Sequence, residues 1–293
     1  MINRDNRKNP SSSGLQKPIW IQEINIRDIL NHGGVLLELM KELPLSLFSA
    51  LSPAELTRYE RQMNLPEWGL TAQQKFKNSR VFIASASGPM ITAALNLAAA
   101  GVGRLKVVDC RRVLLTDLCN QMLYREKDLN KFRVAVAQQR LRETNPFIEV
   151  EAFERKISDH NALRLIEGTD LILADLRDKP TSLALNRAAS RRRLPLIVGW
   201  IQNMRCNIIT LQPGKGLCLE CTGLHDRVRD NEASLGPMST LAGSLIALET
   251  MRLLGGLEPA FLGQLFGFDG NLCRCETEKL KVTPTCPVCG KTF

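Results

Sequence analysis

The sequence lacks the features that would place it in several common classes of protein. No apolar run approaches the ~20 residues that span a membrane, and residues 1–17 are polar, without the apolar segment of a secretory signal. Aromatic residues make up only 5% of the chain, which leaves few stacking platforms for single-stranded nucleic acid. None of the three histidines lies in a recognisable ligand or catalytic motif. We therefore expect a cytoplasmic protein that partners neither membranes nor nucleic acid.

The composition is that of a folded protein with a substantial interior. Its 293 residues suffice for one large α/β domain or two smaller ones, and a hydrophobic fraction of 44% can form a sizeable core. The net charge of +9 is spread along the chain and suits an acidic protein partner or a nucleotide. We expect a disordered arm over residues 1–17, a small helical N-terminal extension over 18–51 and a main domain over 52–293.

The main domain is organised around residues 78–109. An apolar run at 80–84, a turn of small residues, an alanine-rich stretch at 91–100 and a second apolar run at 105–108 follow one another. This order predicts a strand–helix–strand unit of a parallel sheet. Strand and helix patterns alternate as far as Leu211, so we expect a Rossmann-like, doubly wound and mainly parallel α/β sheet.

The turn after the first strand departs from the pattern of a dinucleotide site. In that pattern, G-x-G-x-x-G, missing side chains let phosphates approach the backbone N–H groups at a helix N-terminus. Here the three glycine positions hold Ser85, Ser87 and Met90, while one glycine, Gly88, is off the pattern. The sequence thus predicts the scaffold of a nucleotide site with altered phosphate-binding chemistry, and we expect Met90 to crowd the helix packing.

Two further groups of polar residues are candidates for a site. Arg58 and Arg61 lie three apart on a predicted helix that Ser52 and Glu55 would cap, and they form either a phosphate clamp or a solvated basic face. Asp109 ends the second strand, where a carboxylate either binds ribose hydroxyls or caps a turn.

The C-terminal part, residues 217–293, carries the strongest local signal, which is two Cys-x-x-Cys pairs: Cys218, Cys221, Cys286 and Cys289. This spacing lets two thiolates reach one ion, and two such pairs complete a closed, structural and therefore non-catalytic zinc site. A redox pair or coincidental cysteines are the alternatives. We also expect additional strands at 261–268 and 271–275, the second with Cys273 and Cys275 on one face.

Several of these motifs follow one another in a recognisable order. They are Arg58-Tyr-x-Arg61-Gln62, Asn78-Ser-Arg-Val, Ala99-Ala-Gly-Val-Gly-Arg104, the strand that ends in Asp109, Asn145-Pro146 and the two cysteine pairs. The order resembles the ThiF/MoeB/HesA family, bacterial relatives of ubiquitin-activating enzymes. The resemblance, which extends from about Leu51 to the C-terminus, implies a homodimer with a Rossmann-like sheet. It also implies that Mg-ATP is used to adenylate the C-terminal glycine of a ubiquitin-like sulfur carrier, before a sulfur nucleophile attacks the adenylate.

The resemblance assigns roles to matched positions. Arg58 and Arg61 match the family's RYxRQ motif, whose second arginine reaches the ATP phosphates of the neighbouring subunit. Asp109 matches the first aspartate of a D-x-D motif, which holds the ribose, whereas Arg111 replaces the second aspartate.

Other matched positions differ from the family pattern. In the S-N-L-x-R-Q motif, Asp117 replaces the asparagine and Asn120 replaces the arginine, while Gln121 is retained. Arg133 stands at the position of the nucleotide-binding lysine, which keeps the charge but changes the geometry.

The magnesium position changes the sign of its charge. Arg177 stands where the family's T-D-N segment has its Mg²⁺-binding aspartate, and Asp175 and Asp178 are nearby substitutes. The loop after Cys221 contains no cysteine that could serve as a sulfur-relay thiol.

Because these departures fall on one small site, we expect a degenerate, non-adenylating member of the family. It would bind a carrier that ends in Gly-Gly, or pair with an active homologue and lend it Arg61; ATP and Mg²⁺ remain possible cofactors beside structural Zn²⁺. The alternative is an active adenylyltransferase with a rewired site. In either case Arg61 and Arg133 are the catalytic candidates, and the residual nucleotide site comprises Arg58, Ser85, Ser87, Gly88, Asp109, Gln121 and Asp178.

Overall fold

The computed structural model of the chain describes residues 51–215, 217–228, 233–280 and 286–289. All of them belong to one compact unit, Ala50–Phe293. The expected disordered arm at 1–17 and the helical extension at 18–51 lie outside the described residues, apart from Leu51. In the described part of the chain, no helix combines the length and the apolar character needed to cross a membrane.

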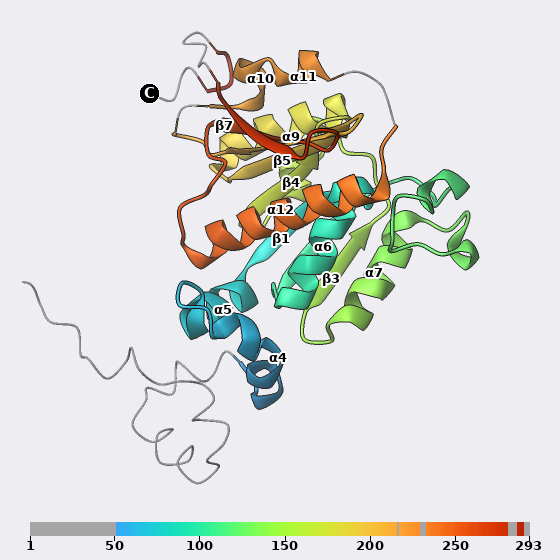
Figure 1. Cartoon of the computed structure of the whole chain (residues 1–293), viewed down its shortest axis with the longest axis vertical. Helices are drawn as coiled ribbons and strands as arrows, with labels where there is room; N and C mark the ends of the chain where they lie inside the picture. The colour runs from blue at the N-terminus through green and yellow to red at the C-terminus, as the bar shows by residue number, and fades with distance from the viewer. Residues whose placement is uncertain (1–50, 216, 229–232, 281–285, 290–293) are drawn as a thin grey trace, which may run out of the picture. The chain divides into compact units, whose positions relative to one another are not determined.

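An eight-stranded sheet forms the centre of the unit, in the order β3-β2-β1-β4-β5-β6-β7-β8 (Figure 1). The neighbours from β3 to β5 pair in parallel, and those from β5 to β8 pair antiparallel. The expected Rossmann-like, mainly parallel sheet is therefore confirmed. The strands are β1 Arg80–Ala84, β2 Arg104–Val108, β3 Glu149–Phe153, β4 Leu171–Asp175, β5 Leu196–Gln202, β6 Arg205–Leu211, β7 Gln264–Asp269 and β8 Arg274–Lys279.

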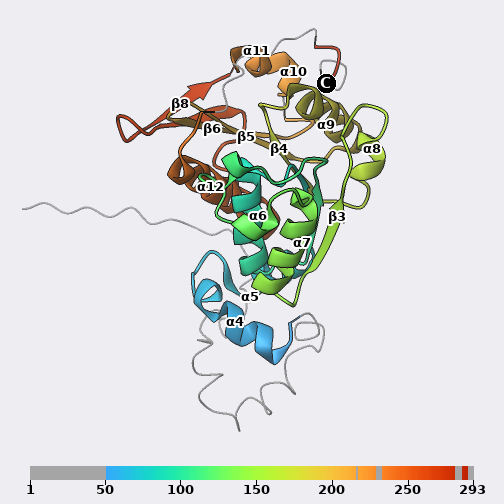
Figure 2. The same cartoon turned by 90° about the vertical axis from the view of Figure 1, so that its right-hand side faces the viewer.

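Helices cover both faces of the sheet (Figure 1 and Figure 2). Successive residues of a strand point to opposite faces, so Val81 and Ile83 of β1 join one apolar cluster while Phe82 and Ala84 join the other. The first cluster is covered by α5 Gly69–Asn78, α6 Gly88–Ala100, α7 Arg133–Thr144 and α12 Gly236–Gly255. The second is covered by α8 Ala162–Leu165, α9 Lys179–Arg192, α10 Leu219–Thr222 and α11 Leu224–Arg227.

The side chain of Met90, in the first turn of α6, points into the protein interior. Met90 is fully buried in the first apolar cluster. The close approach in this region lies instead between α6 and α12, where a Cβ on Gly243 would lie 2.6 Å from the carbonyl oxygen of Pro89. The glycine at the close approach of these two helices is therefore on α12.

The last two strands begin later than the sequence predicts. β7 begins at Gln264 rather than at 261, and β8 spans Arg274–Lys279 rather than 271–275. Cys273 lies in the turn between them with a φ of +50°, so only Cys275 belongs to the strand, and the prediction that both cysteines share a strand face was wrong. The six residues of β8 are all exposed and mostly charged. Charged side chains are common on an edge strand, where they discourage pairing with another sheet.

The helix α4, Pro53–Met63, begins with the expected capping box. The Ser52 hydroxyl accepts a hydrogen bond from the Glu55 N–H at 3.3 Å, and the Glu55 carboxylate accepts one from the Ser52 N–H at 2.9 Å. Glu55 is also paired with Lys77 of α5. Hydrogen bonds from Lys77 and Ser52 outweigh the opposing effect of burial, so the pKa of Glu55 is lowered.

The retained family motifs meet at the amino edge of the sheet. The Asn145 side chain, which is fully buried, donates to the Tyr59 hydroxyl and to the Ala98 carbonyl, each at 2.7 Å. Gln62 donates to the carbonyl of Ala100 at 2.8 Å. Gly101 follows with a φ of +84°, and a Cβ there would lie 2.5 Å from the ring of Tyr59. These motif residues thus lock α4, α6 and the end of α7 together.

Candidate functional site

A cleft of about 820 Å³ opens at the carboxyl edge of the parallel strands. The strand order reverses direction between β1 and β4, and ligands of doubly wound folds bind at such a switch point. The residues that follow β1, β2 and β4 all line this cleft, together with the loop after β2 and the start of α12. Its charged side chains are Asp109, Arg111, Asp117, Arg133, Arg155, Lys156, Asp175, Arg177 and Asp178.

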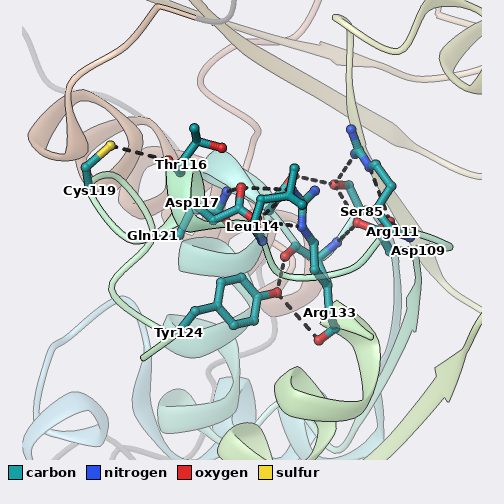
Figure 3. A network of polar contacts seen from close by, with 12 residues as sticks. Ser85, Asp109, Arg111, Leu114, Thr116, Asp117, Cys119, Gln121, Tyr124 and Arg133 are labelled. Atoms are coloured by element: carbon teal, nitrogen blue, oxygen red, sulfur yellow. Dashed lines mark hydrogen bonds and ion pairs between the residues drawn. The ribbon is translucent and has the colours of Figure 1, made fainter. Parts of the chain in front are cut away.

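Asp109 lies at the end of β2, as expected, but its carboxylate is already engaged within the protein (Figure 3). One oxygen accepts hydrogen bonds from the Ala86 N–H at 2.9 Å and the Ser85 hydroxyl at 3.3 Å. The other accepts the Arg111 N–H at 2.8 Å and its Nε at 3.4 Å. Burial acts to lower the pKa of Arg111, but the charge of Asp109, the hydrogen bond to it and the charges of Asp178 and Asp175 together outweigh burial, and the pKa is raised. The second position of the D-x-D pattern therefore neutralises the first.

Ser85 keeps the backbone conformation of a glycine. Its φ is +104°, in a region that favours glycine, and a residue with a side chain is strained there. Its hydroxyl lies 2.8 Å from that of Ser87 and accepts from Nη2 of Arg111 at 3.2 Å. Ser87 is the extended residue that precedes α6, with a φ of −148°. The turn thus retains its shape, and serine hydroxyls occupy the space that a glycine-rich turn leaves for a phosphate.

Arg133 is buried at the start of α7 and paired with Asp117 (Figure 3). Its Nε and Nη2 donate to the carboxylate of Asp117 at 2.7–3.0 Å. Both family departures in this part of the cleft, aspartate for asparagine and arginine for lysine, therefore meet in one ion pair. Two of the three guanidinium nitrogens of Arg133 are directed to a carboxylate of the protein rather than to a ligand.

Two neighbours of this pair were not singled out by the sequence, or not for the role they have. Tyr124, which is buried, donates its hydroxyl proton to the Ala86 carbonyl and thereby joins the turn after β1 to the loop before α7. Burial raises its pKa well above the usual range. Gln121 donates to Asp117 at 2.9 Å, while its own Oε1 is buried without a hydrogen-bond partner. The sequence singled out Gln121 as a nucleotide-site residue rather than as a partner of Asp117, and it gave no signal for Tyr124 beyond its place in a polar loop.

Arg177 lies over the turn at the N-terminus of α6. A Cβ on Gly88 would come within 2.9 Å of its Nη2. The guanidinium binds Asp175 through Nε and Nη2, the shortest contact being 2.6 Å. Asp178, the other substitute for a magnesium ligand, caps α9 by accepting from the N–H of Thr181 at 3.3 Å. A cation thus covers the place where the helix N-terminus would meet a phosphate.

The residues of this cleft do not fit Mg-ATP. Magnesium sites need carboxylates that are free to bind the ion, and Asp175 is neutralised by Arg177. The ribose position at Asp109 is saturated by internal donors, and the phosphate turn is covered.

The structure separates Arg58 and Arg61 from the cleft of their own chain. Both lie on α4 at the amino edge, and Arg58 donates to the carbonyl of Thr144 at the end of α7. Arg61 is exposed. Neither arginine is among the residues that line the cleft.

The four cysteines of the C-terminal part come together at one point, and all their sulfur atoms lie within 4.8 Å of one another. The Sγ atoms of Cys218 and Cys286 are 3.6 Å apart, as are those of Cys221 and Cys289. A tetrahedral zinc with Zn–S bonds of about 2.3 Å separates its sulfurs by roughly 3.8 Å, so this cluster could hold the ion. Burial raises the pKa of the Cys289 thiol to about 12, and a cation is what would keep these thiols ionised.

A network next to the cysteines positions the first pair. The Leu219 N–H, between Cys218 and Cys221, donates to Asn186 of α9 at 2.9 Å. Glu220 accepts from Arg187 at 3.0 Å, and Arg187 in turn holds Asp159. The cluster is therefore tied to the second apolar layer independently of any metal.

Comparison with known proteins gives consistent matches for this architecture. The sequence model of the ThiF family matches residues 59–289. The chain is 34% identical over 242 residues to the heterocyst protein HesA of Trichormus variabilis, covering 82% of this chain and 91% of that protein. It is 32% identical over 247 residues to the sulfur carrier protein adenylyltransferase of Thermus thermophilus, covering 80% and 91%.

Solved structures agree on the fold. The crystal structure of E. coli MccB with MccA-N7isoASN superposes with a TM-score of 0.72 at 23% identity, covering 92% of this chain and 83% of that one. With the family model spanning most of the chain and relatives above 30% identity covering four fifths of it, the chain belongs to the ThiF family, the family of the HesA proteins and the sulfur-carrier adenylyltransferases.

Proposed function

We propose that this protein is a ThiF-family member that does not form an adenylate and acts as a binding subunit, either for a ubiquitin-like carrier or for an active homologue. The observation that carries the proposal is the set of three arginine–aspartate pairs in the cleft: Arg111 with Asp109, Arg133 with Asp117, and Arg177 with Asp175. Each pair includes at least one position where the chain departs from the family pattern.

The physical reason concerns charge. Adenylation needs cations and Mg²⁺ that are free to neutralise the charge that develops on the phosphates, and these groups must be in place before the reaction. An arginine that is already paired with a buried carboxylate must break that pair first. Of the three pairs, only Arg133–Asp117 is buried on both sides, and leaving one member of a buried pair without its partner costs about 3–5 kcal/mol. The pairs of Arg111 and Arg177 are partly exposed and add less.

The binding role is supported by the relatives of the chain and by features that lie outside the cleft. The relative from Thermus thermophilus is named for a sulfur carrier protein, which supports a carrier of that kind as the partner here. The exposed Arg61 on α4 supports association with a second chain, in a homodimer or in a heterodimer with an active homologue. We assign structural Zn²⁺ to the four cysteines, since they form a closed ligand set.

A second candidate is an active adenylyltransferase with a rewired site. The observation in its favour is that the cleft keeps a volume of about 820 Å³ and retains cationic side chains. In that case Arg61 of a second chain, Arg133 and Asp178 would be the working residues.

ATP–pyrophosphate exchange and calorimetric titration with Mg-ATP, on zinc-loaded protein with carriers ending in Gly-Gly added, separate the two. We expect no exchange and no heat of ATP binding, while a carrier or a homologous partner still binds. Exchange that Arg61→Ala abolishes would establish the second candidate instead. The exposed Arg192→Ala serves as the matched control because it lies at the end of α9.

A variant restoring the family pattern sharpens the test. Ser85→Gly, Ser87→Gly and Arg177→Asp together should reopen the turn and expose the N-terminus of α6, giving measurable ATP binding where the unchanged protein gives none. Failure of this variant to bind ATP, in a protein with unchanged thermal unfolding, would show that these three positions are not what blocks the nucleotide.

A further inference from the structure

The first cysteine pair of the cluster is anchored on helix α9. Within the pair, the Cys218 N–H donates to Sγ of Cys221 at 3.2 Å. The N–H of Leu219, which lies between the two cysteines, donates to the buried side chain of Asn186 on α9 at 2.9 Å. The second pair meets the first through two sulfur contacts of 3.6 Å. The first pair therefore forms a half-site that is positioned by the body of the protein.

A carboxylate lies beside this half-site. Oε2 of Glu220 is 4.0 Å from Sγ of Cys218. A tetrahedral zinc with bonds of about 2.3 Å to sulfur and about 2.1 Å to oxygen separates the two ligand atoms by roughly 3.6 Å. A shift of a few tenths of an ångström therefore brings the carboxylate within bonding distance of an ion held by Cys218 and Cys221.

Glu220 is more accessible than the sulfur atoms. Its side chain is 17% exposed, whereas the four cysteines are buried. The carboxylate is also oriented, because it accepts hydrogen bonds from Nδ2 of Asn186 and, at 3.0 Å, from Nη1 of Arg187. Glu220 thus offers an ion in solvent an oriented ligand atom close to sulfurs that are themselves covered.

The charge around Glu220 favours a cation. Arg187 binds Asp159 through Nε and Nη2, each at 2.8 Å, while its Nη1 binds Glu220. One guanidinium is thus shared by two carboxylates, and the three groups together carry one negative charge. The nearby Asp226 is paired with Lys179 at 3.0 Å and does not change this balance. A net negative charge beside the thiols attracts a divalent cation.

We propose that Glu220 is the entry ligand of the zinc cluster: it binds the ion together with Cys218 and Cys221, and the second cysteine pair then replaces it in the closed site. The inference rests on the assignment of zinc to the four cysteines. In the exchange the carboxylate leaves as a free anion, and the thiols that bind release their protons to solvent. Thiolate is the softer ligand and is preferred by zinc over carboxylate oxygen, which favours this exchange. Because a temporary ligand lowers the barrier in both directions, Glu220 speeds binding and release of the ion without changing the affinity of the closed site.

The first test isolates the half-site in the full chain. Cys286→Ala with Cys289→Ala removes the second pair, and Co²⁺ is the probe because its absorbance reports thiolate ligands. This variant should bind Co²⁺ more weakly than the unchanged protein, with about half of the thiolate-to-cobalt absorbance, since two thiolates remain of four. Adding Glu220→Gln should weaken that binding by about tenfold or more. Adding Asp226→Asn, which removes the same charge from the exposed α11 next to the site, should leave it unchanged.

The second test keeps all four cysteines and decides the matter if the pair variant does not fold. Uptake of Zn²⁺ by the metal-free full chain and its release from the loaded chain to a chelator are measured by stopped flow. Glu220→Gln should slow both rates severalfold, while their ratio, which gives the affinity, stays the same. The amide of this variant still accepts hydrogen bonds from Asn186 and Arg187, so a role limited to anchoring the loop would leave both rates unchanged.

Several results would overturn the inference. Equal Co²⁺ binding by the pair variant with and without Glu220→Gln would exclude a ligand role. Rates that Glu220→Gln leaves unchanged, or a loss of affinity at an unchanged rate of uptake, would show that Glu220 acts only on the structure of the loop. If the unchanged protein takes up neither Zn²⁺ nor Co²⁺, the zinc assignment itself fails. If it binds them through four thiolates and Glu220→Gln has no effect, only the entry role fails. The absence of adenylation is tested separately by pyrophosphate exchange.

Discussion

The two edges of the parallel sheet compare differently with the family pattern that the resemblance implies. At the amino edge, Tyr59, Gln62 and Asn145 match the family motifs, and they hold three helices together. At the carboxyl edge, the residues that the resemblance expected to differ from the family pattern form ion pairs within the cleft. One edge keeps its residues and the other keeps only its shape.

This difference separates two kinds of motif residue. Asn145 is needed because a buried amide satisfies backbone and side-chain groups of α4 and α6, whatever the protein does. A phosphate-binding glycine or a magnesium aspartate is needed only while its ligand is bound. When such residues change, new charges stay buried only if they are paired, and the cleft shows such pairs. The motif residues that hold helices together therefore identify the fold, but they do not show whether the protein binds the family's ligand.

The largest effect is expected at the cysteines, where the pattern is intact. Cys289→Ser should abolish tight zinc binding, because three thiolates do not complete a closed site. Losing a cross-link over a loop of this length costs about 4 kcal/mol, so the midpoint of thermal unfolding should fall by roughly 10 °C. Zinc content by atomic emission and thermal unfolding would be measured, with the exposed Cys275→Ser as the control. Unchanged zinc content in Cys289→Ser would exclude the proposed ligand set.

The next largest effect on stability is expected at the carboxyl edge of the sheet. Arg133→Ala leaves the carboxylate of Asp117 buried and unpaired, which should lower the free energy of unfolding by about 3–5 kcal/mol. The double change Asp117→Asn with Arg133→Lys, which restores the family residues, should cost far less than the single change. Denaturant unfolding of both variants measures the coupling. If the two costs were equal, the ion pair would not be what stabilises this wall of the cleft.

A smaller effect on stability is expected at the amino edge of the sheet. Asn145→Ala removes the hydrogen bonds donated to Tyr59 and Ala98 and the one accepted from the Phe147 N–H, so the free energy of unfolding should fall by about 2–3 kcal/mol. The cost of Asn145→Ala should add to that of Arg133→Ala in the double variant, because Asn145 is not among the residues that line the cleft. Asn96→Ala, on the exposed side of α6, is the control for stability. A double variant whose cost departs from the sum of the two single costs would mean that the two edges are not independent.

The smallest effect has the opposite sign. Ser85→Gly relieves a strained φ of +104°, a relief of about 1–3 kcal/mol, while it loses hydrogen bonds and makes the unfolded chain more flexible. We expect a net gain of about 1 kcal/mol in denaturant unfolding. Ser87→Gly, at an unstrained φ of −148°, should instead destabilise the protein. A loss of stability in both variants would show that the hydroxyl contacts of Ser85 outweigh the strain.

The sequence predicted the fold well because the signals were local. The βαβ pattern placed β1 and β2 to within a residue, and the capping box at Ser52 marked the start of α4. The four cysteines could be grouped by spacing alone, and they do lie together. β8 was misplaced because its charged, exposed residues have no apolar alternation from which a strand can be read.

The cleft could be predicted only in outline. The altered positions were visible one by one, but their pairing was not, because Asp117 and Arg133 lie 16 residues apart in a loop and a helix. The direction of Arg177 over Gly88 depends on how β1 and β4 lie side by side. The side-chain oxygen of Gln121 is buried without a hydrogen-bond partner, which depends on how the residues around it pack and cannot be read from the sequence.

The position of the cysteine pairs has a thermodynamic consequence for the cleft. Three residues of its lining, Ala233, Ser234 and Ser239, belong to the stretch of chain between Cys221 and Cys286. A metal that fastens both ends of this stretch restricts the same segment that a ligand must order. Coupling of that kind is reciprocal: a ligand of the cleft would raise the affinity for zinc by the factor with which zinc raises the affinity for the ligand.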